Sequence, residues 1–457
     1  MKNNYNISYI FKIFLILFLF SDVSYGQLAD NSFKLRLNDK INSGNLKPEI
    51  QKSDSVKTSK KYTPGAGFNL VDTEDGSVNI GIFSYIRYLN QKALDTSYTD
   101  AFGKTKTIQQ RQDVQLNKVN IKFFGWIMDP GFRYIFYVWT SNTSIGQVSQ
   151  VVVAGNLQYK LNKNFNFGAG INSLPGVRST TGNFPYWLPV DNRLIADEFF
   201  RPSYTTGVWA NGDITKGMDY SFMAGNNLSQ FGVNAGQLDN GLRTFSGMLR
   251  WYPTTGEYGQ FSAYGDFDNH KKAATLLSGH FTYSEENKES QPKNDQFENV
   301  QLRLSDGSIV FTPDLFGNGI TINDAVYKMA SFDAGIKYKG FALEGEYYLR
   351  WLSNFTGAGT DSLGFNLITD NGFQAMMSYM IIEKKLMAYT TFSQVFGDYG
   401  NPWDARIGLN VYPWKNQAFR WNIEYIQIYR SPVGALSLPY PVGGTGGIFN
   451  MDFMVNF

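Results

Sequence analysis

The chain ends with Gly447-Ile-Phe-Asn-Met-Asp-Phe-Met-Val-Asn-Phe457, a stretch whose side chains alternate between an apolar and a polar face. The apolar face carries Phe449, Met451, Phe453, Val455 and Phe457, and the polar face carries Asn450, Asp452 and Asn456, with Met454 as its exception. A repeat of two residues indicates a β-strand. At about 3.3 Å per residue, about ten tilted residues cover the roughly 25 Å apolar band of a transmembrane barrel wall. A single strand of this kind also fits a soluble β-sandwich, so the rest of the chain must decide.

The composition favours the barrel. Aromatic residues make up 16% of the 457 residues and charged residues only 18%, against about a quarter in typical soluble proteins. Such a profile suits a wall with one face in lipid and aromatic girdles at both interfaces. The chain has no cysteine, which excludes disulfides, thiolate metal sites and a cysteine nucleophile. A net charge of +2 gives no indication of nucleic-acid binding.

The N-terminal region divides into two segments of different character. Residues 1–26 combine Lys2, an apolar run at 10–20 and the small residues of Ser24-Tyr25-Gly26, which together predict a signal peptide. Residues 27–65 are polar and lack apolar periodicity, so we expect a flexible periplasmic segment. Residues 66–457 then form the predicted barrel, integral to the outer membrane.

Alternation recurs along the remainder of the chain. It is clear at 78–88, 118–123, 132–138, 165–171, 220–224, 245–251, 332–338, 341–349, 405–411 and 419–425. Short connectors at 128–131, 161–164, 214–217, 339–340, 382–385 and 413–417 alternate with long ones at 91–111, 142–149, 172–203, 227–242, 284–328, 352–371, 397–403 and 431–446. This pattern predicts an all-β, antiparallel, up-and-down transmembrane barrel of about 16 strands with both ends periplasmic. Segment 252–274 is too long for a short turn, and a hairpin there would raise the count to about 18.

Because apolar side chains alternate with polar ones along each strand, the polar face predicts which charged side chains point into the barrel lumen. The predicted pore-lining basic residues are Arg87, Lys118, Lys122, Arg133, Arg250, Lys337, Arg350, Arg406 and Arg420. Fewer acidic residues share these faces, namely Asp333, Glu344, Glu346, Asp404, Glu424 and Asp452. A basic excess on a pore wall favours anions. Alternatively, these charges pair with one another and simply solvate the lumen.

The long segment 172–203 is the second candidate site. Its charged residues are Arg178, Asp191, Arg193, Asp197, Glu198 and Arg201. A loop of this length with prolines and aromatic anchors is expected to be packed. Folded inward it would constrict the pore, whereas folded outward it would only cap the rim; we expect the inward arrangement.

Catalysis is not expected. The only imidazoles are His270 and His280, and the pairing of His280 with Ser278 on one strand face is common by chance. No calcium-loop or phosphate-binding motif is present, so we predict no metal and no cofactor.

Four stretches carry a resemblance to a known family. They are Gly170-Ile-Asn-Ser-Leu-Pro-Gly-Val-Arg178, Asp191-Asn-Arg193, Arg201-Pro-Ser-Tyr-Thr-Thr-Gly-Val208 and Met218-Asp-Tyr-Ser-Phe-Met-Ala-Gly-Asn226. Together they resemble the phosphate-selective porin O and P family over most of residues 66–457. The resemblance implies a homotrimeric outer-membrane porin whose third loop enters the pore. It also implies that the barrel-assembly machinery reads Phe457 as an assembly signal. Porins of that family have a dense row of arginines along the lumen, which in this sequence is interrupted by Glu344, Glu346 and Glu424. The resemblance therefore implies a pore more strongly than it implies a preference for phosphate.

The predicted function is a diffusion channel for small anionic or neutral hydrophilic solutes, with mild anion, including phosphate, preference. A monomeric barrel that transports apolar ligands, as fatty-acid transporters do, is the alternative, although the polar segment 27–65 makes a poor apolar plug. A barrel hydrolase is a more distant alternative.

Overall fold

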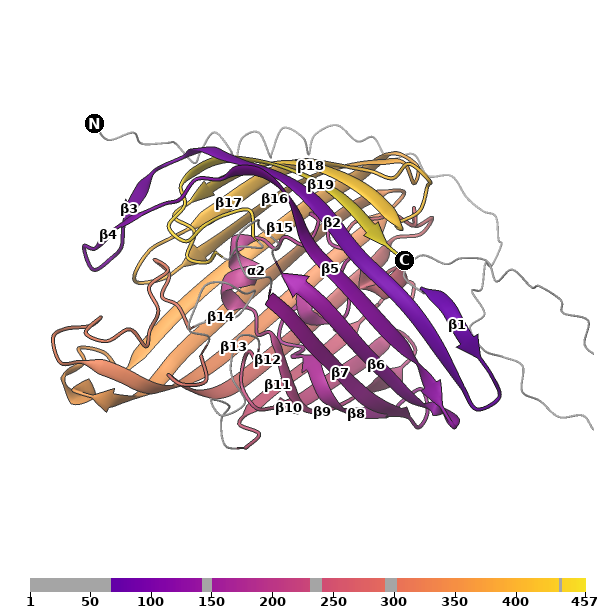
Figure 1. The fold of residues 1–457 in the computed structure, drawn as a ribbon, viewed down its shortest axis with the longest axis horizontal. Helices are drawn as coiled ribbons and strands as arrows, with labels where there is room; N and C mark the ends of the chain where they lie inside the picture. The colour runs from indigo at the N-terminus through magenta and orange to yellow at the C-terminus, as the bar shows by residue number, and fades with distance from the viewer. Residues whose placement is uncertain (1–66, 142–149, 231–240, 292–301, 435–437) are drawn as a thin grey trace, which may run out of the picture. The chain divides into compact units, whose positions relative to one another are not determined.

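A computed structural model describes residues 67–141, 150–230, 241–291, 302–434 and 438–457, and these form a closed antiparallel β-barrel (Figure 1). The main sheet has 17 strands, of which β1 (Phe68–Asp72) pairs only with the start of β2, leaving 16 in the ring. The ring strands are β2 (Gly76–Leu94), β5 (Gln112–Ile127), β6 (Asp129–Ser141), β7 (Gln150–Lys160), β8 (Asn166–Ser173), β9 (Tyr204–Thr215), β10 (Met218–Gly225), β11 (Thr244–Trp251), β12 (Ala274–Asn287), β13 (Thr321–Tyr338), β14 (Phe341–Ala358), β15 (Leu367–Ile382), β16 (Leu386–Phe396), β17 (Trp403–Val411), β18 (Phe419–Tyr429) and β19 (Gly446–Asn456). The predicted fold and strand number are confirmed. The signal peptide and the polar segment predicted at 1–65 lie outside the described residues.

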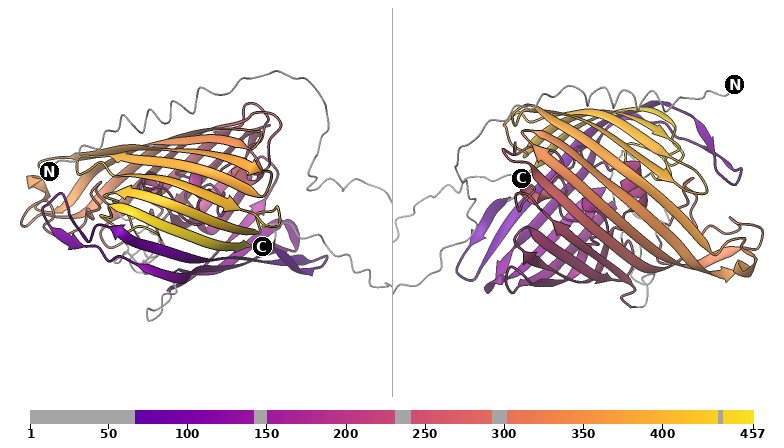
Figure 2. Two further views of the ribbon diagram at one scale, coloured as in Figure 1. Left: turned by 90° about the horizontal axis from the view of Figure 1, so that it is seen from above. Right: turned by 180° about the vertical axis from the view of Figure 1, so that it is seen from behind.

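Each ring strand pairs with its sequence neighbour, and β19 closes the ring against β2 (Figure 2). The short connectors gather at one end of the barrel, here named the short-turn rim, and the longer ones at the other, the long-loop rim. Lys339 and Gly340 link β13 to β14 with φ of 50° and 82°. Two positive φ angles are what the tightest hairpin turn between twisted strands requires.

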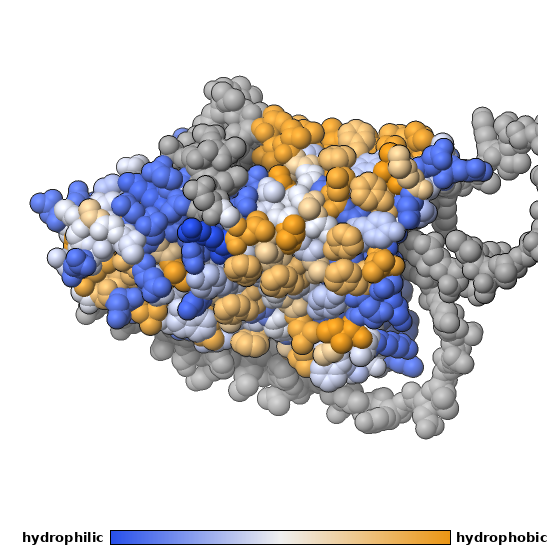
Figure 3. All heavy atoms as spheres, turned by 90° about the horizontal axis from the view of Figure 1, so that it is seen from below, coloured by the Kyte–Doolittle hydropathy of each residue, from blue (hydrophilic) through white to orange (hydrophobic). Residues whose placement is uncertain are grey.

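The side-chain alternation places apolar groups on the outside of the barrel. Val153 and Ile407 are 73% and 65% exposed, whereas their strand neighbours Ala154 and Arg406 are buried. Figure 3 shows apolar side chains gathered over the middle of one outer face and hydrophilic ones at its ends. Exposed aromatic residues mark the short-turn rim, among them Phe132, Phe165, Trp251, Tyr338, Phe341 and Trp414. An apolar band bordered by aromatic rings is typical of transmembrane barrels.

Remaining elements are short. They are the outer hairpin of β3 (Ser97–Thr99) and β4 (Thr105–Thr107), the helix α2 (Ile195–Phe200), and the 3-10 turns η1 (Arg178–Thr180), η3 (Gln260–Ser262) and η4 (Thr360–Ser362). No described helix has the length and apolar character needed to cross a membrane.

Two expectations about connectors are corrected. Segment 252–273 forms no strand pair but folds into the barrel, so the alternative of about 18 strands is wrong. Strands β13 and β14 extend into regions expected to be loop, because their backbones keep pairing from Thr321–Ala358 to Tyr338–Phe341.

The two ends of the barrel domain meet beside β2. Phe457 exchanges backbone hydrogen bonds with Ile82, and β1 continues the same edge of β2 with Phe68 opposite Ile80. The rings of Phe68 and Phe457 lie 5.4 Å apart. The terminal Phe457 is thus part of the closing seam, and its role as an assembly signal stays a prediction.

Candidate functional site

The loop between β8 and β9 folds into the barrel, as expected. Three of its carbonyl groups accept hydrogen bonds from wall side chains: Arg193 from Arg406 (2.7 Å), Leu188 from Asn410 (2.9 Å) and Trp187 from Arg420 (2.5 Å). Figure 1 places α2, the helix of this loop, inside the ring of strands. A backbone so far from bulk water needs such partners, and two arginines and one asparagine of the wall supply them.

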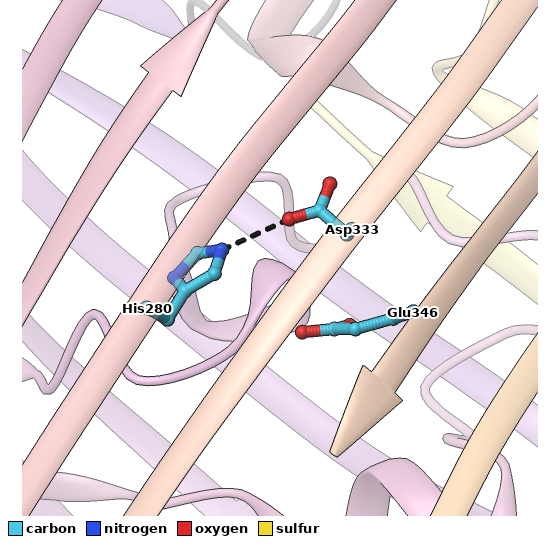
Figure 4. Close-up of side chains that lie close together, drawn as sticks. All are labelled: His280, Asp333 and Glu346. Atoms are coloured by element: carbon cyan, nitrogen blue, oxygen red, sulfur yellow. Dashed lines mark hydrogen bonds and ion pairs between the residues drawn. The ribbon is translucent and has the colours of Figure 1, made fainter. Parts of the chain in front are cut away.

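A buried polar cluster anchors the start of this loop (Figure 4). His280 Nε2 lies 3.0 Å from Asp333 on the next strand, and His280 Nδ1 lies 2.9 Å from the carbonyl oxygen of Pro175. Glu346, on β14, accepts a hydrogen bond from the backbone amide of Arg178. The Arg178 side chain reaches Glu344 at 2.6 Å and Asp333 at 3.9 Å. Three adjacent strands therefore hold one short stretch of the loop.

His280, Asp333 and Glu346 are also the described residues grouped closely enough to hold a metal ion, with ligand atoms within 4.8 Å of one another. Their geometry does not favour that role. Ser278 and His280 already bond to Asp333, while Ser331 and Tyr348 donate to Glu346. The nearby guanidinium of Arg178 would repel a cation, so the cluster fits a structural anchor better.

Most of the predicted pore-lining basic residues lie inside the barrel but are engaged by other protein groups. Arg87 pairs with Asp452 at 2.7 Å, Arg350 with Asp370 at 2.6 Å and Arg406 with Asp404 at 2.6 Å. Arg420 bonds to the loop, and Lys337 bonds to the carbonyls of Tyr258 and Ala263. We name the strands β12–β19 together with β2 the packed wall, because their inward side chains are buried against folded segments.

Segment 252–273 supplies part of this packing from the short-turn rim. Gly265 donates its amide to Glu344, and Asp266 accepts the amide of Gly340. Its residue His270 lies 2.5 Å from Asp266 and 3.3 Å from Glu257. Burial lowers the pKa of His270, but these two carboxylates outweigh burial and raise that pKa to about 9. The hydrogen bond with His270 is the main cause that lowers the pKa of Glu257 to about 2.

Two adjoining cavities follow the opposite side of the interior. The first, of about 510 Å³, lies towards the short-turn rim and is lined by β7–β11 and the loop. The second, of about 370 Å³, lies between the loop and strands β5–β9. They share Asn172, Ser173, Gly182 and Asn211. We name the strands β5–β11 the cavity wall.

The charges that line these cavities are mostly positive. The basic residues are Lys118, Lys122, Lys160, Lys163, Arg193, Arg201 and Arg250, and the acidic residues are Asp191, Asp213 and Asp219. Seven cations thus face three carboxylates. Lys118 lies 2.6 Å from Asp191, and Arg250 lies 3.1 Å from Asp219.

The cavities include only part of the predicted site. Of the nine strand residues, Lys118, Lys122 and Arg250 line a cavity. Arg133 is exposed at the short-turn end of β6, where it bonds to Pro130. The loop residues Asp191, Arg193 and Arg201 line the second cavity. Arg178 belongs to the buried cluster with His280, Asp333 and Glu346. The carboxylates of Asp197 and Glu198 line neither of the two cavities and lie 3.7 and 3.5 Å from the Arg193 side chain.

Sequence reasoning missed two lining lysines and several polar neighbours. Lys160 ends β7 and Lys163 lies in the turn after it, a position that alternation alone assigns to the rim. The amides of Asn120, Asn156 and Gln158 fall on the inward face by parity. The three amides could have been predicted if every inward polar residue, and not only the charged ones, had been considered.

The sequence matches no protein-family model and no curated protein. Solved structures with a similar fold include the anion-selective porin from Comamonas acidovorans, with a TM-score of 0.51, 8% identity and coverage of 84% of this chain and 100% of that chain. Another is the outer-membrane expressed OmpT of Vibrio cholerae, with a TM-score of 0.50, 9% identity and coverage of 85% and 99%. The outer membrane channel DcaP of Acinetobacter baumannii is a third, with a TM-score of 0.50, 9% identity and coverage of 86% and 100%. At these identities the likeness is one of fold, and the chain has the 16-stranded barrel fold found in outer-membrane porins and channels.

Proposed function

We propose that this chain is an outer-membrane porin that lets small hydrophilic solutes diffuse along the cavity wall, with mild preference for anions. The observation that carries the proposal is the pair of adjoining cavities, whose lining has seven basic and three acidic side chains. Rings of like charge near a narrow path lower the electrostatic barrier for counter-ions. Two of the proteins with a similar fold are an anion-selective porin and an outer membrane channel, which supports this proposal.

Two alternatives find less support. An apolar ligand would have to lose contact with water next to the charged and amide side chains of both cavities, which is unfavourable. A serine hydrolase needs its serine and its carboxylate on different ring nitrogens of the histidine. Here Ser278 and Asp333 both contact Nε2 of His280, and Nδ1 faces a carbonyl oxygen.

The assembly and export of the barrel belong to the same proposal. It includes a signal peptide at 1–26, a polar periplasmic segment at 27–65 and recognition of Phe457 by the barrel-assembly machinery. A homotrimer is also proposed, and the trimer form of OmpT of Vibrio cholerae is a structural precedent at a TM-score of 0.50. Mass measurement of the purified protein in detergent tests the trimer, because a monomer would contradict it.

Planar-bilayer recording tests the channel and its selectivity together. In a potassium chloride gradient we expect a reversal potential of the sign that indicates anion preference, and phosphate current measured in the same membrane tests the phosphate prediction. Lys122→Glu should shift the potential towards cations, since it changes the lining from seven basic and three acidic residues to six and four. Lys384→Asn is the matched control, because Lys384 lies in the turn between β15 and β16, lines neither cavity, and has a φ of 55° that Asn tolerates. Absence of any conductance would contradict the porin, and cation preference of the unaltered chain would contradict the anion claim.

A further inference from the structure

The second cavity differs from the first in its aromatic lining. Six aromatic side chains border it, namely Tyr137, Trp139, Phe184, Trp187, Tyr204 and Trp209. The Trp209 ring packs directly against Gly168 of β8. A Cβ atom added to Gly168 would lie only 2.4 Å from Cζ2 of Trp209. Flat apolar faces of this kind pack against the C–H face of a ring-shaped solute. A volume of about 370 Å³ is also within the usual range of small-molecule pockets.

One cation of this cavity, Lys122, has no carboxylate partner among the residues that the structure describes. Lys118 pairs with Asp191, Arg201 with Glu198, and Arg193 lies between Asp197 and Glu198. For Lys122, no ion pair with any described residue is formed. Its Nζ lies 5.4 Å from the centre of the Phe124 ring. A half-buried ammonium without a counter-ion favours a ligand that carries one negative charge.

Several polar groups of the same wall also lack hydrogen-bond partners in the described part of the chain. The side chains of Asn120 and Gln158 form no hydrogen bond within the described part of the chain, although both line the cavity. Asn156 uses its Nδ2 on Ile171, but its Oδ1 has no described partner, and neither does Ser203 Oγ. Amides that are not fixed by the protein can turn to donate to, or accept from, the hydroxyl groups of a ligand.

We propose that the second cavity is a binding subsite for an acidic monosaccharide of the hexuronate type. Its carboxylate pairs with Lys122, its hydroxyl groups bond to Asn120, Asn156 and Gln158, and its ring packs on the aromatic lining. A neutral sugar would leave Lys122 without a counter-ion, an aromatic carboxylate would offer the amides no hydroxyl, and an inorganic anion would leave the aromatic faces unused. The inference rests on the proposed channel, in which the subsite selects solutes that enter.

Isothermal titration of the purified full chain in detergent tests the subsite with four probes: glucuronate, glucose, benzoate and inorganic phosphate. We expect glucuronate to bind more tightly than the other three. Lys122→Gln should weaken glucuronate binding by at least about tenfold without weakening glucose, because losing one partner of a shielded charge pair typically costs that much. Asn120→Leu should weaken both sugars, whereas Lys384→Asn should leave all four isotherms unchanged.

Other results overturn the subsite. Equal binding of glucuronate and glucose, tighter binding of benzoate or phosphate, or glucuronate binding that is insensitive to Lys122→Gln each contradict it. Heat-dependent migration in gels and circular dichroism identify variants that fail to fold. Conductance of the same preparation separates the two proposals, since a conducting channel that does not bind glucuronate overturns the subsite alone. Binding without any conductance overturns the channel instead.

Discussion

The two walls of this barrel use the same strand architecture but treat inward charges differently. On the packed wall, Arg406 has Asp404 at 2.6 Å and a loop carbonyl at 2.7 Å, and its side chain is fully buried. On the cavity wall, Lys122 is half-buried and lies beside a cavity, with no carboxylate among its described neighbours. In the proposed channel, an inward cation can act on passing ions only where no folded segment covers it. Charge alone does not distinguish the two roles.

The packed wall explains why a wide barrel leaves a narrow path. A ring of about 16 strands encloses an aqueous channel unless other segments fill it. Here the loop from β8 to β9, segment 252–273 and parts of two further loops enter the interior, as shown by buried Val177, Tyr264, Leu304 and Tyr440. The two cavities described above lie on the side of β5–β11.

The largest expected effect comes from breaking the anchor of the packed wall. Arg178→Met removes the cation that lies 2.6 Å from Glu344 and 3.9 Å from Asp333, and removal of one partner from a buried ion pair typically costs about 3–5 kcal/mol. We expect urea unfolding in detergent to show a loss of this order, and the released loop should raise single-channel conductance.

Lys122→Met is the matched change on the cavity wall. Because Lys122 forms no ion pair with a described residue, the free energy of unfolding of the variant should differ from that of the unaltered chain by no more than about 0.5 kcal/mol. Equal losses for the two variants would contradict the distinction between the walls.

An intermediate effect is expected where the two walls meet. Asp191, from the loop, accepts hydrogen bonding from Tyr85 at 2.8 Å and pairs with Lys118 at 2.6 Å. Asp191→Asn keeps a residue that tolerates its φ of 46° but removes the negative charge. We expect the reversal potential to shift towards anions, because the cavity lining loses one of its three carboxylates. An unchanged potential would show that this pair does not face the permeation path.

The smallest effect concerns pH and segment 252–273. The pKa of His270 is raised to about 9, so its charge stabilises docking of the segment fully below about 6.5, and this contribution is lost as pH rises towards 9. Glu257 has a pKa lowered to about 2, so its contribution is present above about 4.5 and is lost as pH falls towards 2.

Trypsin cleavage after the exposed Lys271 and Lys272 measures this docking. Relative to His270→Gln at each pH, the unaltered chain should be protected at pH 6.5 and lose that protection by pH 9. Protection that is independent of pH would contradict the role of His270.

The alternation of apolar and polar residues predicted the barrel well. If a strand shifted its register by one residue, all its lumen side chains would face lipid, so the pattern must be kept. For β19 it assigned Asn450, Asp452 and Asn456 to the interior, where they are buried. Met454, the exception in the pattern, is also inward, and its sulfur lies 3.6 Å from Arg420. A lumen face lined by folded protein accepts an apolar residue as readily as a polar one.

The candidate site was less predictable because it depends on contacts between distant segments. Nothing local to Lys337 indicates that carbonyls of Tyr258 and Ala263 will surround it, since segment 252–273 has no strand periodicity. Likewise, Arg87, Arg350 and Lys122 all point into the barrel, and only the paths of the loops decide which of them is covered. The sequence thus specifies which side chains face inward, whereas tertiary packing decides which of them remain accessible.

Cysteine accessibility tests the separation of the two walls most directly, because the chain has no cysteine of its own. Gln158 on β7 lines the second cavity, and Gln374 on β15 is 2% exposed and donates to Glu346. With single variants Gln158→Cys and Gln374→Cys in planar bilayers, a negatively charged methanethiosulfonate reagent is added while current is recorded. We predict rapid modification and a fall in conductance for Gln158→Cys, and no reaction for Gln374→Cys. Equal reaction at both positions, or reaction at Gln374→Cys alone, would contradict a permeation path confined to the cavity wall.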